Sequence, residues 1–428
     1  MNKIDIVNWM ENRREPNGDY SIKNSKKLLE YLGSPQEFIN IVHVAGTNGK
    51  GSICNYIASA CKNSGIKTGL FISPYIEDIN ESASINGIKI SDEEFAVLGS
   101  RVKEACEKAD LDGYYPTYFD ILTAISYLYF FENRVDIAIV EVGMGGRLDS
   151  TNVMESPLCS VIASISLDHT NFLGDTVAKI AYEKAGIIKV ARPVFSYIQA
   201  DEAVEVLENE AREKHTFVVF LDSKNIKDIV LHEGGSSFSY KNYKNIEISL
   251  AGVHQVYNAA LALDVIDFLK IHYKIDDKSI FCGMKKAQNH ARCETISTSP
   301  HVILDGSHNL EGIMALKNYI KTLSYNRLIL GFSILEDKDY KHITSELIPM
   351  ADEIIITEIK NERKLDIDEL YDIVKSNTKS SVIKIKDNME AFKKSIEESH
   401  EGDLIIWCGS LYLMKEIREG AIEYLKNM

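Results

Sequence analysis

The sequence lacks the features that mark exported and membrane-spanning proteins. Its seven cysteines are scattered between positions 54 and 408, their number is odd, and no C-x-x-C pair occurs. Such a chain has no disulfide framework, which indicates reduced thiols. The N-terminus has no apolar signal region, and no run of about 18 apolar residues could span a bilayer. We therefore expect a cytoplasmic protein.

Positive charge is also scarce. The chain has 48 Lys and Arg against 63 Asp and Glu, a net charge of −15. This balance argues against nucleic acid or an anionic membrane as a partner. An anionic substrate would need basic groups gathered in a cleft, because the overall field repels it. Low-complexity tracts and short-period repeats are absent as well.

The length and composition are those of a soluble globular protein with more than one domain. The chain has 428 residues, of which 45% are hydrophobic and 26% charged. Single hydrophobic cores stop growing near about 250–300 residues, so two domains are expected.

Short apolar runs alternate with longer amphipathic stretches along the first half of the chain. The alternation favours a mostly parallel sheet wrapped by helices. The run D-I-A-I-V-E-V at 136–142 is nearly all apolar, as a strand buried on both faces should be. We expect strands at 39–44, 68–72, 136–142, 160–164 and 193–197, and helices at 91–108, 118–131, 176–188 and 256–269.

The second half divides into an insertion and a further α/β series. Residues 221–250 contain a Gly-Gly-Ser-Ser turn and alternating Phe-Ser-Tyr, which predict a small antiparallel hairpin region. Small polar residues at 295–300 predict a linker. We predict an N-terminal domain of residues 1–296 and a C-terminal domain of residues 297–428, with the active site in the cleft between them. Strands of the second series are expected at 302–304, 327–330, 353–357, 382–386 and 404–407.

The segment V-A-G-T-N-G-K-G-S at 44–52, here called the phosphate loop, is typical of a nucleotide site. In such a site a strand leads through a glycine turn into a helix. The backbone N–H groups and the lysine bind the phosphate, and the hydroxyl at the start of the helix can reach Mg²⁺. The match to G-x-x-x-x-G-K-[ST] is imperfect, since Val44 replaces the first glycine and Gly51 separates Lys50 from Ser52. A bare glycine turn is the alternative.

Glu141 ends the buried strand at 136–142 and precedes the turn G-M-G-G-R-L-D at 143–149. Ligands of open α/β sheets bind beyond the carboxyl ends of strands, and Mg²⁺ accepts one or two carboxylates, so Glu141 is a candidate metal ligand. The alternatives are a solvated turn carboxylate for Glu141 and a surface ion pair between Arg147 and Asp149.

His169 and Lys184 are further candidates with structural alternatives. His169 follows another strand end, where it could share a site with Glu141, although a single histidine is more often structural. Lys184 lies in the last turn of an expected helix before Gly186. The alternative is a surface lysine favoured there by the helix dipole.

Seven blocks in order resemble the folylpolyglutamate synthase/dihydrofolate synthase family, a branch of the Mur ligase superfamily. The resemblance runs from about Tyr20 to Ile417. The blocks are V-A-G-T-N-G-K-G-S at 44–52, E-V-G-M-G-G-R-L-D-S-T-N at 141–152, L-D-H-T at 167–170, E-K-A-G-I at 183–187, G-V-H-Q-V-Y-N-A-A at 252–260, L-D-G-S-H-N at 304–309 and G-S-L-Y-L at 409–413.

The resemblance implies roles for individual residues. ATP would be held by Gly49, Lys50, Gly51, Ser52, Asn258, Arg292 and Asp305. Two Mg²⁺ ions would be bound, one by Ser73 and Glu141 and the other by His169, and the resemblance leaves open a monovalent cation. Lys184 matches a lysine that family members carbamylate. Lys50, His169 and Lys184 are thus the candidate catalytic residues, and Thr117, Tyr118, Phe119 and Asp120 resemble a block near the folate site.

The fold implied is a P-loop, mostly parallel sheet ATPase domain followed by a smaller Rossmann-like α/β domain. The reaction implied is ATP-dependent amide formation between L-glutamate and a folate or dihydropteroate carboxylate, by a monomer. Two alternatives stay open: a Mur-type ligase acting on a cell-wall precursor, and a P-loop ATPase switch that is no ligase.

The chain departs from the family pattern in three places. Asp120, in the block that resembles the folate site, replaces the usual glutamate, which has a longer side chain. His290-Ala291 replaces the common Pro-Gly before Arg292, so the hinge backbone is expected to differ. The block at 20–24 follows the family's folate-contacting segment only loosely. These departures concern the acceptor site and the hinge.

Overall fold

The computed structural model describes residues 1–13 and 21–428, so Tyr20 lies outside the described residues. The chain divides into two compact units. Unit 1 comprises Met1–Asn225 and Tyr257–Ala287, and unit 2 comprises Ile226–Val256 and Gln288–Met428. The predicted hairpin region thus groups with unit 2, although it precedes the predicted boundary. The boundary at 296/297 stays a prediction about the domains.

Unit 1 is built on an eight-stranded sheet in the order β4-β3-β2-β5-β1-β6-β7-β8. The six strands from β2 to β8 in this order pair in parallel, and β3 and β4 add an antiparallel edge. Both β1 and β5 are buried along their whole length, which explains their nearly continuous apolar sequence. The strands are β1 Ile41–Ala45, β2 Thr68–Phe71, β3 Ala83–Ile85, β4 Ile88–Lys89, β5 Ile137–Glu141, β6 Cys159–Ile162, β7 Val194–Ser196 and β8 Val218–Phe220.

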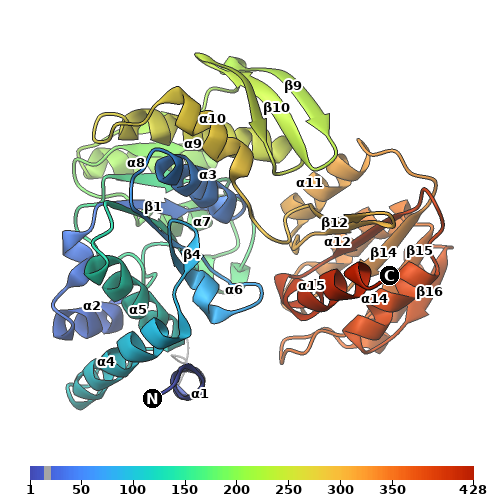
Figure 1. Cartoon of the computed structure of the whole chain (residues 1–428), viewed down its shortest axis with the longest axis horizontal. Coiled ribbons are helices and arrows are strands. Elements are labelled where there is room, and N and C mark those ends of the chain that lie inside the picture. The colour runs from blue at the N-terminus through green and yellow to red at the C-terminus, as the bar shows by residue number, and fades with distance from the viewer. Residues whose placement is uncertain (14–20) are drawn as a thin grey trace. The chain divides into compact units, whose positions relative to one another are not determined.

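Helices cover this sheet. In Figure 1, α2, α4 and α5 lie together at one side of unit 1, where they form one apolar core with β1, β2 and β5. Another core joins α7 and α8 to the ends of β1, β6 and β7. The helices are α1 Lys3–Glu11, α2 Ile22–Tyr31, α3 Lys50–Asn63, α4 Asp92–Leu111, α5 Tyr118–Glu132, α6 Thr170–Leu173, α7 Val177–Ala185, α8 Asp201–Glu213, α9 Val253–Leu269 and α10 Asp277–Lys286, with short 3-10 turns at Pro35–Phe38, Ile79–Ser82 and Ser223–Asn225.

Unit 2 contains a small antiparallel sheet and a larger mixed one. Strands β9 Ile226–His232, β10 Gly235–Tyr240 and β11 Tyr243–Ile248 form a three-stranded meander, which confirms the predicted hairpin region. The larger sheet has the order β12-β13-β17-β14-β15-β16, parallel except for β12. Its elements are β12 Glu294–Thr298, β13 His301–Leu304, α11 Leu310–Ile320, β14 Leu328–Phe332, α12 Tyr340–Leu347, a 3-10 turn Ile348–Met350, β15 Glu353–Ile356, α13 Ile367–Ser376, β16 Ser381–Lys384, α14 Asn388–Glu397, β17 Leu404–Cys408 and α15 Leu411–Lys426.

The predicted linker at 295–300 is wrong. Most of it forms β12, which pairs antiparallel with β13 and lies at the edge of the larger sheet. An edge strand packs on one neighbour only, and the residues of β12 are half-buried or exposed. Small polar residues are compatible with that position, so composition alone could not distinguish the strand from a linker.

The predicted fold class is confirmed by these sheets. A mostly parallel sheet with a phosphate loop after β1 is followed in sequence by a smaller mostly parallel α/β sheet. Within residues 1–13 and 21–428, no helix combines the length and apolar character needed to cross a bilayer.

Candidate active site

The phosphate loop connects β1 to α3 through two glycines at positive φ. Gly46 has φ +148° and Gly49, which precedes the first residue of α3, has φ +89°. A Cβ on Gly46 would lie 2.5 Å from the Cβ of Ala163, and one on Gly49 would lie 2.6 Å from Oδ1 of Asn258. Both positions therefore require glycine for space as well as for conformation. The same packing places Asn258 of α9 against the loop.

Hydrogen bonds attach the loop to the chain after β6. The Thr47 amide donates to the carbonyl of Ser164 (2.7 Å). The Thr47 hydroxyl donates to the Ser166 carbonyl (3.1 Å) and accepts from the Ser166 amide (3.1 Å). These bonds hold the loop in place without a ligand, and the choice between a phosphate site and a bare glycine turn stays a prediction.

Two lysines donate to one carbonyl of this loop. Nζ of Lys50 lies 3.1 Å from the Gly46 oxygen and 3.2 Å from the Thr47 oxygen, and Nζ of Lys184 lies 2.8 Å from the Gly46 oxygen. Lys184 is only 3% exposed, so it is not the surface lysine of the alternative hypothesis. Burial, followed by repulsion from Lys50, lowers the pKa of Lys184 to about 7 although Asp168 and Asp149 oppose the shift.

Glu141 is the last residue of β5 and is 5% exposed, so the solvated-carboxylate alternative is wrong. Its Oε2 accepts from the Ser73 amide at 3.3 Å. The structure therefore brings together Ser73 and Glu141, which the sequence analysis assigned to one Mg²⁺ ion. A carboxylate and a hydroxyl are oxygen donors of the kind that Mg²⁺ accepts beside phosphate oxygens.

The glycine turn after Glu141 holds helix α7 in place. The Arg147 amide donates to the Glu183 carbonyl (2.7 Å), and a Cβ on Gly186 would lie 2.3 Å from the Arg147 Cα. The Arg147 guanidinium donates to Glu210 (2.8 Å) and lies over the Tyr182 ring. This close packing fixes the end of α7 that carries Lys184.

The proposed surface pair between Arg147 and Asp149 is wrong. Asp149 is buried and accepts from the Met144 amide (2.8 Å) and the Thr151 amide (3.0 Å). Burial raises its pKa, and those hydrogen bonds lower it in turn. Asp149 thus closes the glycine turn from inside, while Arg147 pairs with Glu210.

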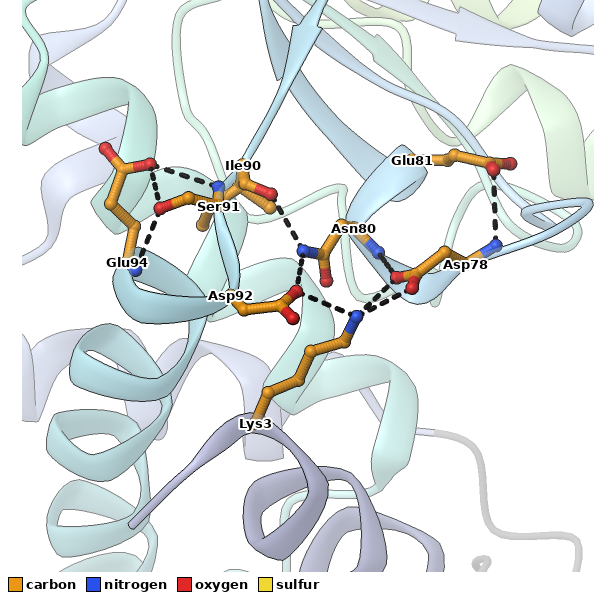
Figure 2. A network of polar contacts seen from close by, with 8 residues as sticks. All are labelled: Lys3, Asp78, Asn80, Glu81, Ile90, Ser91, Asp92 and Glu94. Carbon is orange, nitrogen blue, oxygen red and sulfur yellow. Dashed lines mark hydrogen bonds and ion pairs between the residues drawn. The ribbon is translucent and has the colours of Figure 1, made fainter.

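The segment that follows Ser73 is tied to the N-terminal helix by a charged network (Figure 2). Nζ of Lys3 donates to both carboxylate oxygens of Asp78 (2.8 and 2.7 Å) and to Asp92 (3.0 Å). Asn80 donates to Asp92 (2.7 Å), and the Glu81 carboxylate accepts from the Asp78 amide (3.2 Å). The network joins α1, the segment 76–82 and the start of α4.

His169 contacts its chain neighbour Asp168. Its backbone has φ +50°, its amide donates to Oδ1 of Asp168 (2.9 Å), and its Nε2 lies 4.0 Å from Oδ2 of the same residue. In the described part of the chain, no group of three or more His, Cys, Asp or Glu side chains could hold a metal ion. The assignment of His169 to a second Mg²⁺ stays a prediction.

The four candidate folate residues, 117–120, form the start of α5. Thr117 caps the helix, and its amide and hydroxyl donate to Asp120 Oδ2 (2.7 and 2.8 Å). The other oxygen of Asp120 accepts from the hydroxyls of Ser25 and Ser150 (2.6 Å for Ser150). Asp120 is therefore a buried link between α2, α5 and the turn at 150.

Tyr118 and Phe119 occupy different surroundings. The hydroxyl of Tyr118 lies 3.4 Å from that of Tyr75, and burial raises the pKa of Tyr118. Phe119 packs on Phe71 and covers Gly143, where a Cβ would lie 2.5 Å from its ring. Tyr75, which the sequence analysis did not single out, thus lies beside the candidate folate residues.

Unit 2 carries Arg292 and Asp305 next to each other in the fold. Asp305 is buried, and its carboxylate accepts from the amides of Cys293 (2.8 Å) and Ser307 (2.9 Å). Burial lowers the pKa of the neighbouring His254, Asp305 opposes that shift and Arg292 adds to it. Nδ1 of His254 is buried and has no hydrogen-bond partner among the described residues.

Known proteins match the chain over nearly its whole length. The Mur ligase middle domain matches residues 44–266, and the Mur ligase glutamate ligase domain matches residues 291–411. A dihydrofolate synthase/folylpolyglutamate synthase of Bacillus subtilis is 38% identical, over 97% of this chain and 98% of that protein. The chain belongs to the Mur ligase family.

Solved structures of this family have the same fold. A folylpolyglutamate synthase of Mycobacterium tuberculosis complexed with ADP and AMPPCP aligns with a TM-score of 0.89 and 27% identity, over 97% of this chain and 98% of that one. An FPGS–AMPPCP–folate complex aligns with a TM-score of 0.86 and 29% identity, over 98% and 100%. The predicted membership in the folylpolyglutamate synthase/dihydrofolate synthase branch of the Mur ligases is confirmed.

Sequence reasoning missed groups that support the site of this Mur ligase. Asp168 and His254 lie inside the recognised blocks 167–170 and 252–260 but received no role, and Tyr75 follows Ser73 by two residues, so their positions in the sequence could have drawn attention to all three. The partners Ser25 and Ser150 of Asp120 could not have been found in this way, because nothing in the spacing predicts that one buried carboxylate joins three segments.

Proposed function

We propose that this Mur ligase joins L-glutamate to the carboxylate of a folate or dihydropteroate and converts ATP to ADP and phosphate in the process. The observation that carries the proposal is the convergence of Lys50 and Lys184 on the Gly46 carbonyl in a loop that strand β1 and helix α3 hold rigid. The relatives named above, which include complexes with ADP, AMPPCP and folate, support the same assignment.

The chemistry begins with a poor electrophile. A carboxylate oxygen of the acceptor attacks the γ-phosphorus of ATP, ADP leaves, and an acyl phosphate forms. The glutamate amine then attacks the acyl carbon and loses a proton, and phosphate leaves from the tetrahedral intermediate. Lys50, on the first turn of α3, offsets the charge on the transferring phosphoryl group.

Ser73 and Glu141 are the residues that would hold a Mg²⁺ ion, with His169 assigned to a second ion. When bound, Mg²⁺ neutralises charge on the phosphates and orients them. Gly49, Gly51 and Ser52 would surround the phosphates from the α3 N-terminus, and Asn258, Arg292 and Asp305 are the further nucleotide contacts. Thr117, Tyr118 and Phe119 would line the acceptor site that Asp120 supports.

Lys184 is proposed to react with CO₂. A pKa of about 7 leaves a substantial fraction of its amine neutral at physiological pH, and only a neutral amine forms a carbamate. The carbamate would replace a positive charge by an anion with two oxygen acceptors, which suits a neighbouring Mg²⁺. Mass spectrometry of the native protein at neutral pH, with and without CO₂, measures this directly.

The decisive experiment is a product assay with purified protein. ATP turnover should require both L-glutamate and a pteroate or folate, and should yield one amide per ADP. Comparing dihydropteroate with tetrahydrofolate identifies the acceptor. Turnover that depends on a cell-wall nucleotide precursor would assign the chain to another Mur ligase activity, and ATP hydrolysis without any amide product would assign it to a P-loop switch.

A further inference from the structure

Arg292 lies in an unusual stretch of backbone, residues 290–294, here called the arginine segment. Ala291 has φ +54° and Cys293 has φ +47°, so both neighbours of Arg292 are left-handed although neither is glycine. Such a residue is strained and persists only where its surroundings over-determine it. Something in unit 2 must therefore hold this segment.

Hydrogen bonds hold the peptides on both sides of Arg292. The Ala291 amide donates to Oε2 of Glu294 (2.8 Å), and the Ala291 carbonyl accepts from the Gly306 amide (2.7 Å). The Cys293 amide donates to Oδ2 of Asp305 (2.8 Å). Asp305 is held by its own amide, which donates to the Trp407 carbonyl in β17. Glu294, the other side chain that binds this segment, is held by different contacts.

Glu294, the first residue of β12, is oriented by an arginine from the C-terminal helix. Arg418 of α15 donates through Nε to Oε2 (2.9 Å) and through an Nη to Oε1 (2.6 Å) of Glu294. Nδ1 of His290 lies 3.0 Å from the same Oε1 and 2.8 Å from the Arg418 Nη. Burial acts to raise the pKa of Glu294, but hydrogen bonds from Arg418 and His290 lower it to about 2.

The geometry of this pair fits a bidentate guanidinium–carboxylate contact, which constrains orientation as well as distance. Arg418 is 8% exposed, so the pair is shielded from solvent competition. Oε2 of Glu294 accepts a hydrogen bond from Nε of Arg418 and another from the Ala291 amide. A displacement of the guanidinium is thus passed to the peptide that precedes Arg292.

We propose that Arg418 is a positioning residue for Arg292: through Glu294 it holds Ala291 in the left-handed conformation that fixes the start of the arginine segment. The inference rests on the proposed function, in which Arg292 contacts ATP. In this chain a bidentate ion pair does at position 291 what the conformational freedom of a glycine would do.

The test compares Arg418→Met with Arg327→Met in the full-length protein. Arg327 also lies in unit 2 and donates to two carboxylates, Asp403 (3.1 Å) and Glu353 (3.3 Å), so it is a matched control outside the arginine segment. We expect Arg418→Met to raise KM for ATP and Kd for ADP at least tenfold, while KM for glutamate stays within about twofold. Arg327→Met should leave all of these constants near the parent values.

A second substitution separates positioning from general destabilisation. Glycine adopts φ +54° without support, so Ala291→Gly in the Arg418→Met background should restore most of the lost ADP affinity. If Arg418→Met does not fold, Glu294→Gln is used for the same test. Glutamine keeps the shape of the Glu294 side chain but removes the negative charge that orients Arg418. This substitution should weaken ADP binding with the same Ala291→Gly rescue.

The outcomes are distinct. Unchanged ADP binding in Arg418→Met, or in Glu294→Gln where that variant is used, overturns the inference. An equal loss of ADP affinity in Arg327→Met also overturns it. So does a loss of ADP affinity that Ala291→Gly does not restore. Failure of the proposed function would look different, because the parent protein itself would then form no amide from ATP, glutamate and a folate.

Discussion

The phosphate loop of unit 1 reaches positive φ through Gly46 and Gly49, whereas the arginine segment of unit 2 reaches it through Ala291 and Cys293. Around the glycines there is no room for a Cβ, since Ala163 and Asn258 approach within 2.5 and 2.6 Å of where one would be. Around Ala291 the Cβ is accommodated, and the backbone is held by hydrogen bonds from Gly306 and to Glu294.

The difference separates two causes of a left-handed residue. In the phosphate loop the backbone itself must approach other groups closely, so no side chain can be present. In the arginine segment only the direction of the chain matters, so a small side chain is tolerated where an ion pair compensates for the strain. We therefore expect nucleotide binding by the phosphate loop to be sensitive to any atom added at Gly46 or Gly49. We expect nucleotide binding by the arginine segment to be sensitive to loss of the Arg418 charge.

Lys50→Ala should produce the largest effect. In the described part of the chain, Nζ of Lys50 donates to the loop carbonyls of Gly46 and Thr47, so its removal should leave the fold intact. A preorganised group of this kind is worth about 2.7–4 kcal/mol at the transition state, so kcat should fall by roughly 100- to 1,000-fold. The exposed Lys62→Ala in the same helix is the control. Amide synthesis within threefold of the parent would contradict the role of Lys50.

Gly49→Ala tests the close approach in the phosphate loop. The new Cβ would meet Oδ1 of Asn258 at 2.6 Å while φ is +89°, so we expect a loss of about 1–3 kcal/mol in stability and weaker ADP binding. Gly65→Ala is a matched control, because Gly65 has φ +79° and nothing lies within 4 Å of its ideal Cβ. Calorimetry and thermal unfolding should show a larger loss for Gly49→Ala. Equal losses would mean that conformation, and not contact with Asn258, dictates the glycine.

The contrast also explains what the sequence could predict. Glycine-dependent features were visible, because the glycines themselves stand in the sequence at Gly46, Gly49 and the turn 143–146, where other groups of the protein approach closely. Strands such as β1 and β5 were equally visible, because burial on both faces leaves a nearly continuous apolar run. The order of strands and the family blocks then fixed the location of Glu141 and Lys184.

Features that depend on contacts between distant segments were not predictable. Nothing around position 294 indicates that its carboxylate meets Arg418, 124 residues away. The linker expected at 295–300 failed for a similar reason, since β12 is defined by its pairing with β13 and not by its composition. The surface pair of Arg147 with Asp149 was wrong because Arg147 instead reaches Glu210, 63 residues away.

Arg418 and Lys184 are both buried cations, but they have different partners. Arg418 of α15 donates to the carboxylate of Glu294 in the arginine segment, whereas Lys184 donates to the neutral Gly46 carbonyl in the phosphate loop. Below about pH 7 Lys184 is protonated in both the folded and unfolded states, and the folded state bears the full cost. Between the folded pKa of about 7 and the ordinary value of 10.5, only the unfolded chain binds the proton. Stability should therefore rise with pH by up to about 1.4 kcal/mol per unit in this window.

Lys184→Met should remove that rise. The measurement is denaturant unfolding of the nucleotide-free protein at about pH 6.5 and about pH 9, under CO₂-free conditions so that no carbamate forms. Lys62→Met, at an exposed position, should keep the pH dependence of the parent. If Lys184→Met and the parent respond equally to pH, the ammonium of Lys184 is not destabilised by its burial.

Ala291→Gly alone should have the smallest effect and decides whether the arginine segment is strained. Glycine relieves a left-handed alanine, a gain of roughly 1–2 kcal/mol, and loses more backbone entropy on folding, a cost of roughly 0.5–1 kcal/mol. From these two contributions, the net change in unfolding free energy should lie between zero and about 1.5 kcal/mol of stabilisation. Ala351→Gly is the control, because Ala351 is, like Ala291, buried in unit 2 but has an ordinary φ of −87°, so its substitution should show the entropic cost and the loss of a buried methyl group without any relief of strain. If both substitutions destabilise the protein equally, the alanine at 291 is not strained. The ion pair of Arg418 with Glu294 would then stabilise unit 2 without positioning Arg292, and the two loops would differ in composition only.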